Sequence, residues 1–245
     1  MKRLQGKRAL ITGGTSGIGL ETAKEFLAEG TRVAVTGAST KNIEEARKVL
    51  GRDVLVIQAD AGDVAAQQDI ARQVKEAFGG LDILFVNAGI GDFRPVENWD
   101  EAGFDRSFAV NVKGPYFLIQ ALLPLFANPA SIVLNTSINA HIGMPMSSIY
   151  AATKAALLSM ARTLSGELIS RGIRVNAVSP GPVATPLHGK IGMDDETIKG
   201  LVAQIPVGRR GDAAEIAKAV VFFASDESTF TVGSELIIDG GMSTL

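Results

Sequence analysis

The stretch LITGGTSGIGLETAKEFL, residues 10–27, runs from a short apolar segment through a glycine-rich turn into an amphipathic segment. Its glycines follow the spacing TGxxxGxG. Glycine lets a backbone turn tightly and approach a pyrophosphate closely, while the N-terminus of the next helix offers N–H groups and positive potential. A strand, a turn and a helix in this order predict a dinucleotide-binding site rather than a turn without a ligand. The predicted contacts are Gly13, Thr15, Ser16, Gly17, Ile18 and Gly19.

Apolar runs and amphipathic segments alternate along the rest of the chain. We expect strands at 8–12, 32–36, 53–58, 82–87, 131–137, 173–179 and 234–239, and helices at 17–30, 40–50, 63–78, 99–126, 148–170 and 212–225. Continuous apolar strands separated by helices are typical of a parallel sheet covered on both faces, and right-handed crossovers make it doubly wound. We predict one Rossmann-type α/β domain over 1–245, with a seven-stranded parallel sheet in the order 3-2-1-4-5-6-7.

The composition limits the possible functions. Of the 245 residues 46% are hydrophobic and 20% are charged, which is enough apolar material for a large core. A net charge of −2 argues against nucleic acid or an anionic membrane surface as the partner. The chain has no cysteine and two histidines, which argues against a disulfide, a thiolate nucleophile or a metal site. No secretory signal and no long apolar segment is present, so we expect a cytoplasmic protein.

The end of the second expected strand bears on the choice of cofactor. An acidic residue there would accept a hydrogen bond from the ribose 2′-hydroxyl, but VAVTGAST (33–40) has Gly37 or Ala38 at that position. The missing carboxylate removes repulsion against a 2′-phosphate, and a helix capped by Ser39, with Lys41 beside it, could attract that phosphate. The stretch therefore favours NADPH over NADH, although it lacks the arginine that would fix the preference.

Tyr150 and Lys154 in YAATK (150–154) lie on the same face of the expected helix, because four residues give about 6 Å of rise and little rotation. One use for such a pair is the supply of a proton, for example to the alkoxide that the reduction of a carbonyl leaves. The proton donor should have a pKa near the working pH. A free tyrosine titrates near ~10. A nearby ammonium would favour the phenolate by roughly 2–4 kcal/mol at an effective dielectric constant near 20. On the spacing alone, a packed ring and a solvated lysine are the more common explanation of the pair.

Six stretches in order resemble the short-chain dehydrogenase/reductase family, in its single-domain branch of about 250 residues. They are TGGTSGIG (12–19), VNAG (86–89), Asn111 in AVNVKG, Ser137 in LNTSINA, YAATK (150–154) and SPGPVAT (179–185). YAATK alone would say little, since YxxxK is common by chance. The ordered set is specific, and Tyr150 follows Ser137 by 13 positions.

The resemblance implies a role for each of four catalytic residues. Tyr150 would be the acid/base, and Lys154 would tune it and bind the nicotinamide ribose. Ser137 would orient the substrate oxygen, and Asn111 would hold a water that links Lys154 to solvent.

The resemblance also implies cofactor contacts at the ends of later strands. They are Asp60 and Ala61 beside the adenine, Asn87, Ala88 and Gly89 along the cofactor, and Pro180, Gly181, Val183 and Thr185 at the nicotinamide carboxamide. Ala61 departs from the family, which more often has a larger aliphatic residue there. The implied activity is reversible hydride transfer between NAD(P)(H) and a carbonyl or alcohol.

The substrate is expected to meet residues that follow Ser137 and a lid at about 184–208, which belongs to a Gly- and Pro-rich stretch with a short helix. The expected substrate contacts are Ser137, Asn139, Met144, Tyr150 and Leu187. Apolar side chains without cations favour a neutral, moderately hydrophobic ketone or secondary alcohol. The helix at 148–170 is apolar or small almost all round, so both of its sides should be covered. A 222-type homotetramer would cover the second side.

Other activities are less well supported by the sequence. A 3-oxoacyl-type reductase of the same family stays open, although NAGIGDFRP lacks the NAGITRD pattern of fatty-acid β-ketoacyl reductases. A cofactor-binding regulator without turnover also stays open, but such proteins usually lose one of the four catalytic residues. Sugar-nucleotide epimerases and dehydratases need a further C-terminal domain, for which the tail after Thr185 is too short. Enoyl reductases of this fold use a longer Tyr–Lys spacing.

Overall fold

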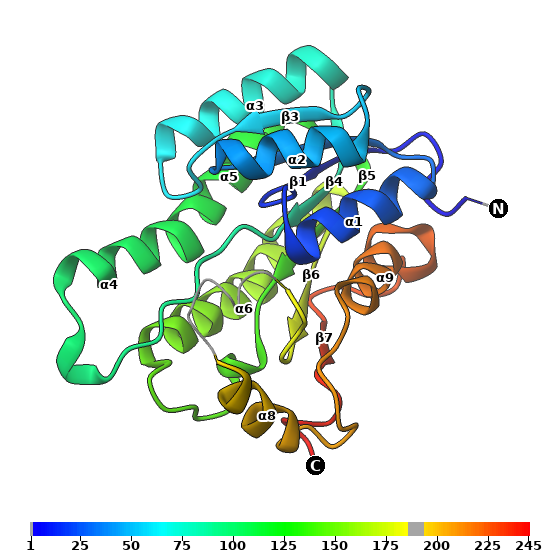
Figure 1. Ribbon diagram of the computed structural model, residues 1–245. Helices are drawn as coiled ribbons and strands as arrows, with labels where there is room; N and C mark the ends of the chain where they lie inside the picture. Colours follow the sequence, from blue (N-terminus) through cyan, green and yellow to red (C-terminus); the bar gives the residue numbers. More distant parts are fainter. Residues whose placement is uncertain (1, 186–193) are drawn as a thin grey trace.

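The computed structural model describes residues 2–185 and 194–245 and has one parallel sheet of seven strands (Figure 1). The strand order β3-β2-β1-β4-β5-β6-β7 confirms the predicted order 3-2-1-4-5-6-7. The strands are β1 Arg8–Ile11, β2 Arg32–Gly37, β3 Leu55–Gln58, β4 Leu81–Val86, β5 Phe126–Asn135, β6 Ile173–Pro180 and β7 Glu235–Ile238.

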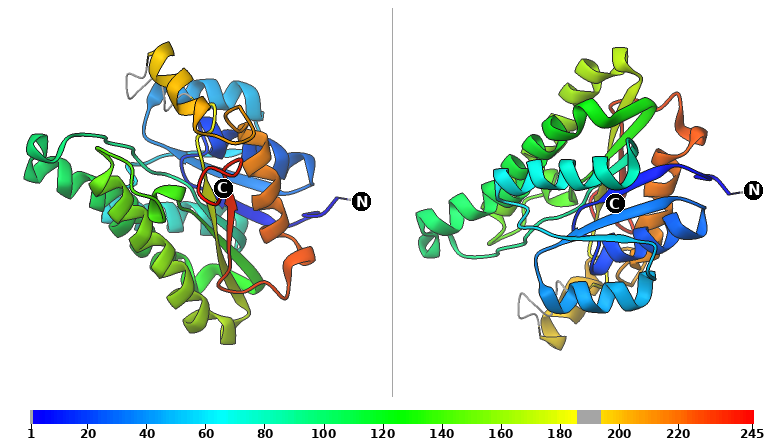
Figure 2. Two further views of the ribbon diagram at one scale, coloured as in Figure 1. Left: turned by 90° about the horizontal axis from the view of Figure 1, so that it is seen from below. Right: turned by 90° about the horizontal axis from the view of Figure 1, so that it is seen from above.

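Helices cover both faces of this sheet and give three layers (Figure 2). One face packs against α1 (Gly17–Ala28), α2 (Thr40–Leu50) and α9 (Ala213–Ala224). The other face packs against α3 (Val64–Phe78), α5 (Gly114–Leu122) and α6 (Ser148–Leu168).

Adjacent residues of each central strand enter different cores, because successive side chains point to opposite faces of a sheet. Leu10 packs with the α3, α5 and α6 side, and Ile11 packs with the α1, α2 and α9 side. Both are fully buried. The strands therefore need apolar residues at every position, which explains their continuous apolar runs.

The helix expected at 99–126 is wrong as a single element. The segment contains α4 (Glu101–Phe108), a π-helical turn (Ala109–Lys113), α5 and the 3-10 turn Leu123–Leu125, and the 3-10 turn Val96–Asn98 precedes it. Pro115 supplies the physical reason for the wide turn. It has no N–H to donate to the carbonyl of Asn111, and its ring would collide with that carbonyl in a regular α-helix. The fifth strand begins earlier than expected, at Phe126 instead of residue 131.

The Gly- and Pro-rich stretch after β6 contains the short helix that was expected there. This helix is α8 (Asp195–Ala203), and the side chain of Asp194 caps its N-terminus by accepting from the Thr197 N–H at 2.8 Å. Leu187, a predicted substrate contact, lies outside the described residues, as does the first part of the predicted lid. No helix within residues 2–185 or 194–245 combines the length and the apolar character needed to cross a membrane.

Gly114, the first residue of α5, is a point of close approach between two segments. A Cβ atom built on it would overlap the carbonyl oxygen of Ala61 and lie 3.2 Å from that of Ala109. We predict that Gly114→Ala destabilises the fold by about 1–3 kcal/mol, because backbone atoms must move. Chemical denaturation measures this change.

Gly166 provides the matched control, since it lies in α6 and a Cβ atom added to it would meet nothing within 4 Å. Gly166→Ala should stabilise the protein by about 0.5–1 kcal/mol through helix propensity. Equal effects of the two substitutions would show that the Gly114–Ala61 approach does not constrain the fold.

Candidate active site

The predicted site residues gather at one edge of the sheet, because parallel strands bring their carboxyl ends together. The glycine turn follows β1, the Gly37–Ser39 segment ends β2, and Asp60 follows β3. Asn87–Gly89 follow β4, Ser137 follows β5, and Gly181 follows β6. Tyr150 and Lys154 lie on α6, which starts at Ser148 after the loop from β5.

The turn between β1 and α1 is built around positions where a side chain cannot fit. Gly13 and Gly17 have φ angles of 62° and 55°, in the left-handed region that favours glycine. A Cβ on Gly19 would overlap the Gly13 carbonyl oxygen and lie 2.5 Å from Nδ2 of Asn87. The turn thus presents bare backbone beside the N-terminus of α1, whose N-cap residue Ser16 makes no side-chain capping bond. Its first N–H groups are suited to an anionic ligand.

Thr12 ties this turn to the segment after β4 and was not predicted as a site residue. Its hydroxyl accepts from the N–H groups of Asn87 at 2.9 Å and Ala88 at 3.0 Å. In return, Nδ2 of Asn87 donates to the carbonyls of Thr12 at 3.0 Å and Gly13 at 3.3 Å. The two predicted cofactor-binding segments are therefore locked together. Thr12 is the first residue of the TGxxxGxG motif, and its place in that motif is the sequence feature from which its role could have been predicted.

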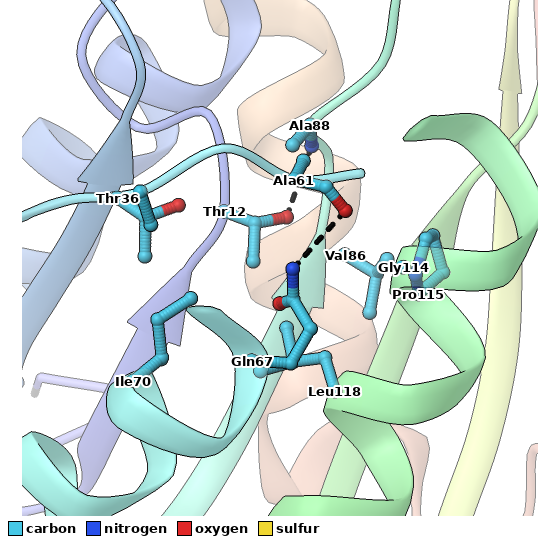
Figure 3. Close-up of a pocket in the computed structure, with 11 residues that line it drawn as sticks. Thr12, Thr36, Ala61, Gln67, Ile70, Val86, Ala88, Gly114, Pro115 and Leu118 are labelled. Atoms are coloured by element: carbon cyan, nitrogen blue, oxygen red, sulfur yellow. Dashed lines mark hydrogen bonds between the residues drawn. The ribbon is translucent and has the colours of Figure 1, made fainter. Parts of the chain in front are cut away.

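A small cavity of about 10 Å³, roughly the space of one water, lies beneath the Ala61 and Ala88 end of the site (Figure 3). Its lining includes Thr12, Gln67 and Leu118, and none of Ser137, Tyr150 or Lys154. The Gln67 amide points to the loop after β3 and donates to the Ala61 carbonyl at 3.1 Å. The short side chain of Ala61, a departure from the family, is part of this cavity.

Asp60, expected beside the adenine, forms a two-pronged ion pair with Arg106 of α4. Its carboxylate accepts from both guanidinium nitrogens, at 2.9 and 3.0 Å, and from the Gly62 N–H at 2.8 Å. The hydrogen bonds from Arg106, above all, lower the pKa of Asp60. A Cβ on Gly62 would lie 2.8 Å from Nη1 of Arg106, so the glycine leaves room for this pair. The sequence reasoning did not predict a role for Arg106.

Asn111 is buried in the π-helical turn and its side chain is fully used. Its Oδ1 accepts from the Ile90 N–H at 2.9 Å, and its Nδ2 donates to the Ile90 carbonyl at 2.9 Å. Nδ2 also donates to the Thr153 hydroxyl at 3.1 Å. The amide therefore joins the loop after β4 to α6, and both of its N–H hydrogens are used in doing so.

The structure brings Ser137, Tyr150 and Lys154 together. The Ser137 side chain lies near the Tyr150 phenol, and the Lys154 ammonium lies 5.6 Å from the centre of the tyrosine ring. Burial raises the pKa of the Tyr150 phenol, and the nearby Ser137 side chain works in the opposite direction. The lowering of the Tyr150 pKa that was expected from the Lys154 charge is not found here.

Lys154 is a buried amine with few partners. It is 5% exposed and donates to the Asn135 carbonyl at 2.8 Å. Burial lowers its pKa to about 8, because the charged form loses hydration. An ammonium has three hydrogens to donate, and one of them is used for Asn135. The side chain can therefore donate further hydrogen bonds to oxygen atoms of a ligand.

The predicted substrate contacts after Ser137 lie close to the catalytic group. The Ser137 hydroxyl accepts from the Asn139 N–H at 3.2 Å, and Nδ2 of Asn139 contacts Sδ of Met144 at 3.8 Å. Phe93, from the segment after Gly89, packs its ring 5.3 Å from the Tyr150 ring. The Phe93 ring thus covers one side of the Tyr150 ring.

The remaining predicted contacts are on β6 and the loop that follows it. Pro180 ends β6, and the Gly181 N–H donates to the Ile238 carbonyl at 3.0 Å. A Cβ on Gly181 would come within 2.6 Å of the Asp239 Cβ. Val183 is 5% exposed and is bridged to Gly211, and Thr185 is half-buried. This loop is therefore held against β7 and the α9 side.

The chain's residues fit a nicotinamide dinucleotide. The glycine turn exposes backbone N–H groups at the N-terminus of α1, where Ser16 makes no side-chain capping bond, and Lys154 has hydrogens available for hydroxyl oxygens. Ser39 caps α2 by accepting from the Asn42 N–H at 3.4 Å. Among the described residues, no group of three or more His, Cys, Asp or Glu side chains is arranged to hold a metal ion.

Comparison with known proteins agrees with this geometry. The family model for Enoyl-(Acyl carrier protein) reductase matches residues 13–243. Oxidoreductase asL5 of Sarocladium schorii is 36% identical over 100% of this chain and 99% of its own length. Glucose 1-dehydrogenase of Gluconobacter oxydans is 36% identical over 98% of this chain and 93% of its own. A solved structure of a candidate betaketoacyl-ACP reductase is 41% identical, covers 99% and 100% of the two chains, and has a TM-score of 0.88.

The chain belongs to the short-chain dehydrogenase/reductase family of oxidoreductases, whose members use NAD(P)(H). The match extends over essentially the whole chain, as the ordered motifs predicted.

Proposed function

We propose that this protein transfers a hydride reversibly between NAD(P)(H) and a neutral, moderately hydrophobic ketone or secondary alcohol. The observation that carries the proposal is the contact set of Ser137, Tyr150 and Lys154 on the edge of the sheet that holds the glycine turn. A glycine turn and a tyrosine–lysine pair at the same edge of the sheet support a site that binds a nucleotide and transfers a proton.

The bound dinucleotide supplies the hydride for reduction or accepts it for oxidation. As the substrate carbonyl takes up the hydride that the dinucleotide would supply, Tyr150 would give its phenolic proton to the carbonyl oxygen, and an alcohol and a phenolate would result. Ser137 donates a hydrogen bond to the same oxygen and orients it. The Lys154 ammonium stabilises the phenolate and binds ribose hydroxyls, and Asn111 connects Lys154 to solvent for reprotonation.

The proposal of a neutral substrate is supported by the apolar side chains of Phe93 and Met144 near Tyr150 and Asn139. Phe93 and Met144 supply contact area without charge, so a phosphate or a second carboxylate would find no cation among these side chains. A 3-oxoacyl-type reductase is the second candidate, and it is favoured by the 41% identity to the candidate betaketoacyl-ACP reductase. A sugar substrate, as in the name of the Gluconobacter relative, would need more polar groups than these.

NADPH is the cofactor we propose, and the β2 end supports it. A Cβ on Gly37 would overlap the Thr15 hydroxyl, so no carboxylate side chain fits there beside the present Thr15. Ala38 and Ser39 are exposed next to the N-terminus of α2. A 2′-phosphate would meet the N–H groups of that helix without repulsion from a carboxylate.

Assembly into a homotetramer and a cytoplasmic location are also proposed. Apolar side chains lie exposed on the α9 and β7 side of the described chain, with Phe230 fully exposed and Leu236 39% exposed. A second copy of the chain would cover these apolar side chains, and few charged groups would lose their hydration in the contact. Fractionation of cells with antibody detection tests the location, and recovery in a membrane or secreted fraction would contradict it.

The proton-donor role predicts that Tyr150→Phe lowers kcat by at least about 10³-fold while NADPH affinity changes little, because only the hydroxyl is removed. Turnover is measured as NADPH oxidation with a panel of ketones, 3-oxoacyl thioesters and enoyl thioesters, and as NADP reduction with glucose. Tyr116→Phe is the control, since the only other tyrosine lies on α5 and is 46% exposed. Turnover near the wild-type rate in Tyr150→Phe would refute the proton-donor role.

The same panel tests the alternative that the protein is a cofactor-binding regulator. NADPH binding by the wild type without turnover on any substrate would favour that alternative.

The cofactor proposal predicts opposite effects of two substitutions at the exposed Ala38. Ala38→Arg should tighten NADPH binding about tenfold through a charged bond to the 2′-phosphate, and Ala38→Asp should weaken it by a similar factor. Fluorescence titration with NADPH and NADH gives both affinities, and Ala38→Arg should leave NADH binding within about twofold. Wild-type protein that binds NADH tenfold more tightly than NADPH would overturn the proposal.

The assembly proposal predicts a particle of four times the mass of one chain in light scattering at micromolar concentration. Phe230→Asp should reduce that mass, because a charge in an apolar interface is costly to bury. A monomer in the wild type would contradict the proposal.

A further inference from the structure

Thr153 stands between the proposed proton donor Tyr150 and Lys154, and its side chain is completely buried. Its hydroxyl donates to the backbone carbonyl of Tyr150 at 2.7 Å and accepts from Nδ2 of Asn111 at 3.1 Å. Both hydrogen-bonding functions of the hydroxyl are therefore used inside the protein. No role for this residue follows from the glycine turn or from the catalytic spacing.

The Thr153 hydroxyl completes a chain of contacts across three elements. At one end, the Asn111 amide exchanges two hydrogen bonds of 2.9 Å with the backbone of Ile90. Asn111 itself belongs to the π-helical turn, and Thr153 belongs to the first turns of α6. Without the hydroxyl, one hydrogen of the Asn111 amide would be left buried without a partner, and the Tyr150 carbonyl would lose a donor.

We propose that Thr153 is a positioning residue for the proposed hydride transfer. Its hydroxyl holds the Asn111 amide and the beginning of α6 in a single arrangement, so that the Tyr150 phenol and the Lys154 amine keep their places. It touches none of the reacting atoms, and its effect on the reaction passes through Asn111 and the α6 backbone. The inference rests on the proposed function for its kinetic consequence, and on the hydrogen bonds alone for the structural link.

Three variants separate this link from ordinary packing. Thr153→Val keeps the shape and removes the hydroxyl, while Thr153→Ser keeps the hydroxyl and removes the methyl group. Thr163→Val is the matched control, because Thr163 lies on the same helix and donates to the Ser159 carbonyl at 3.2 Å on an exposed face.

The first readout is amide hydrogen exchange in the full-length protein, followed by mass spectrometry. Thr153→Val should speed exchange in peptides covering 109–114 and 148–154 by up to about tenfold, the range expected for one lost hydrogen bond. Thr153→Ser and Thr163→Val should stay within about twofold of the wild type in these peptides. Unchanged exchange in Thr153→Val would overturn the link.

The second readout is steady-state kinetics with the best ketone of the panel. Thr153→Val should lower kcat about tenfold and leave KM within about twofold, and Thr153→Ser should restore most of kcat. In an Asn111→Ala background the same substitution should cost less than about twofold, because the link is already broken. An equal loss in both backgrounds, or a change in KM alone, would refute the positioning role. Wild-type protein without turnover would refute the proposed function instead, and the exchange data would still decide the link.

Discussion

The wide turn at Ala109–Lys113 is the constraint on which the site depends. Pro115 withholds the N–H that the Asn111 carbonyl would otherwise receive, so the helix from α4 to α5 cannot continue regularly. The displaced turn carries the Asn111 side chain to Ile90 and Thr153. It also lets Gly114 approach the Ala61 carbonyl, next to the Asp60 carboxylate that Arg106 holds. Pro115 thereby influences the backbone at two places. One is near Asp60, at the proposed adenine end of the site, and the other is near Asn111 and Thr153, at the proposed catalytic end.

A second line of hydrogen bonds connects the glycine turn to Lys154 through the interior of the sheet edge. Asn87 donates to the turn, its Oδ1 accepts from Nδ2 of Asn135 at 2.9 Å, and the Asn135 carbonyl accepts from Lys154. Oδ1 of Asn135 is buried without a hydrogen-bond partner. The amine that is proposed to bind ribose is therefore positioned by the segments that form the nucleotide cradle, and a shift in one would be felt by the other.

The sheet order and the position of the site could be predicted because they depend on alternation and on motif spacing along the chain. Apolar runs at regular intervals define the strands, and the glycine turn, Ser137 and YAATK define the carboxyl edge. The broken helix could have been predicted from Pro115, but its apolar pattern continues across the break and hides it. Arg106, Asn135 and Thr153 could not be predicted, since their partners are far away in sequence and polar residues of these kinds are usually solvated.

The packing of Gly37 against Thr15 has a consequence for how such a protein could change its cofactor over evolution. An acidic residue at 37 collides with Thr15, and a smaller residue at 15 brings no gain by itself. The effect of each substitution therefore depends on the other. If the acidic residue at 37 comes first, the intermediate is strained, and if residue 15 changes first, the intermediate has an unchanged cofactor preference. A lineage that first lost the Thr15 methyl and hydroxyl by drift would be free to acquire the carboxylate at 37, whereas its sisters would have to place it at the exposed Ala38.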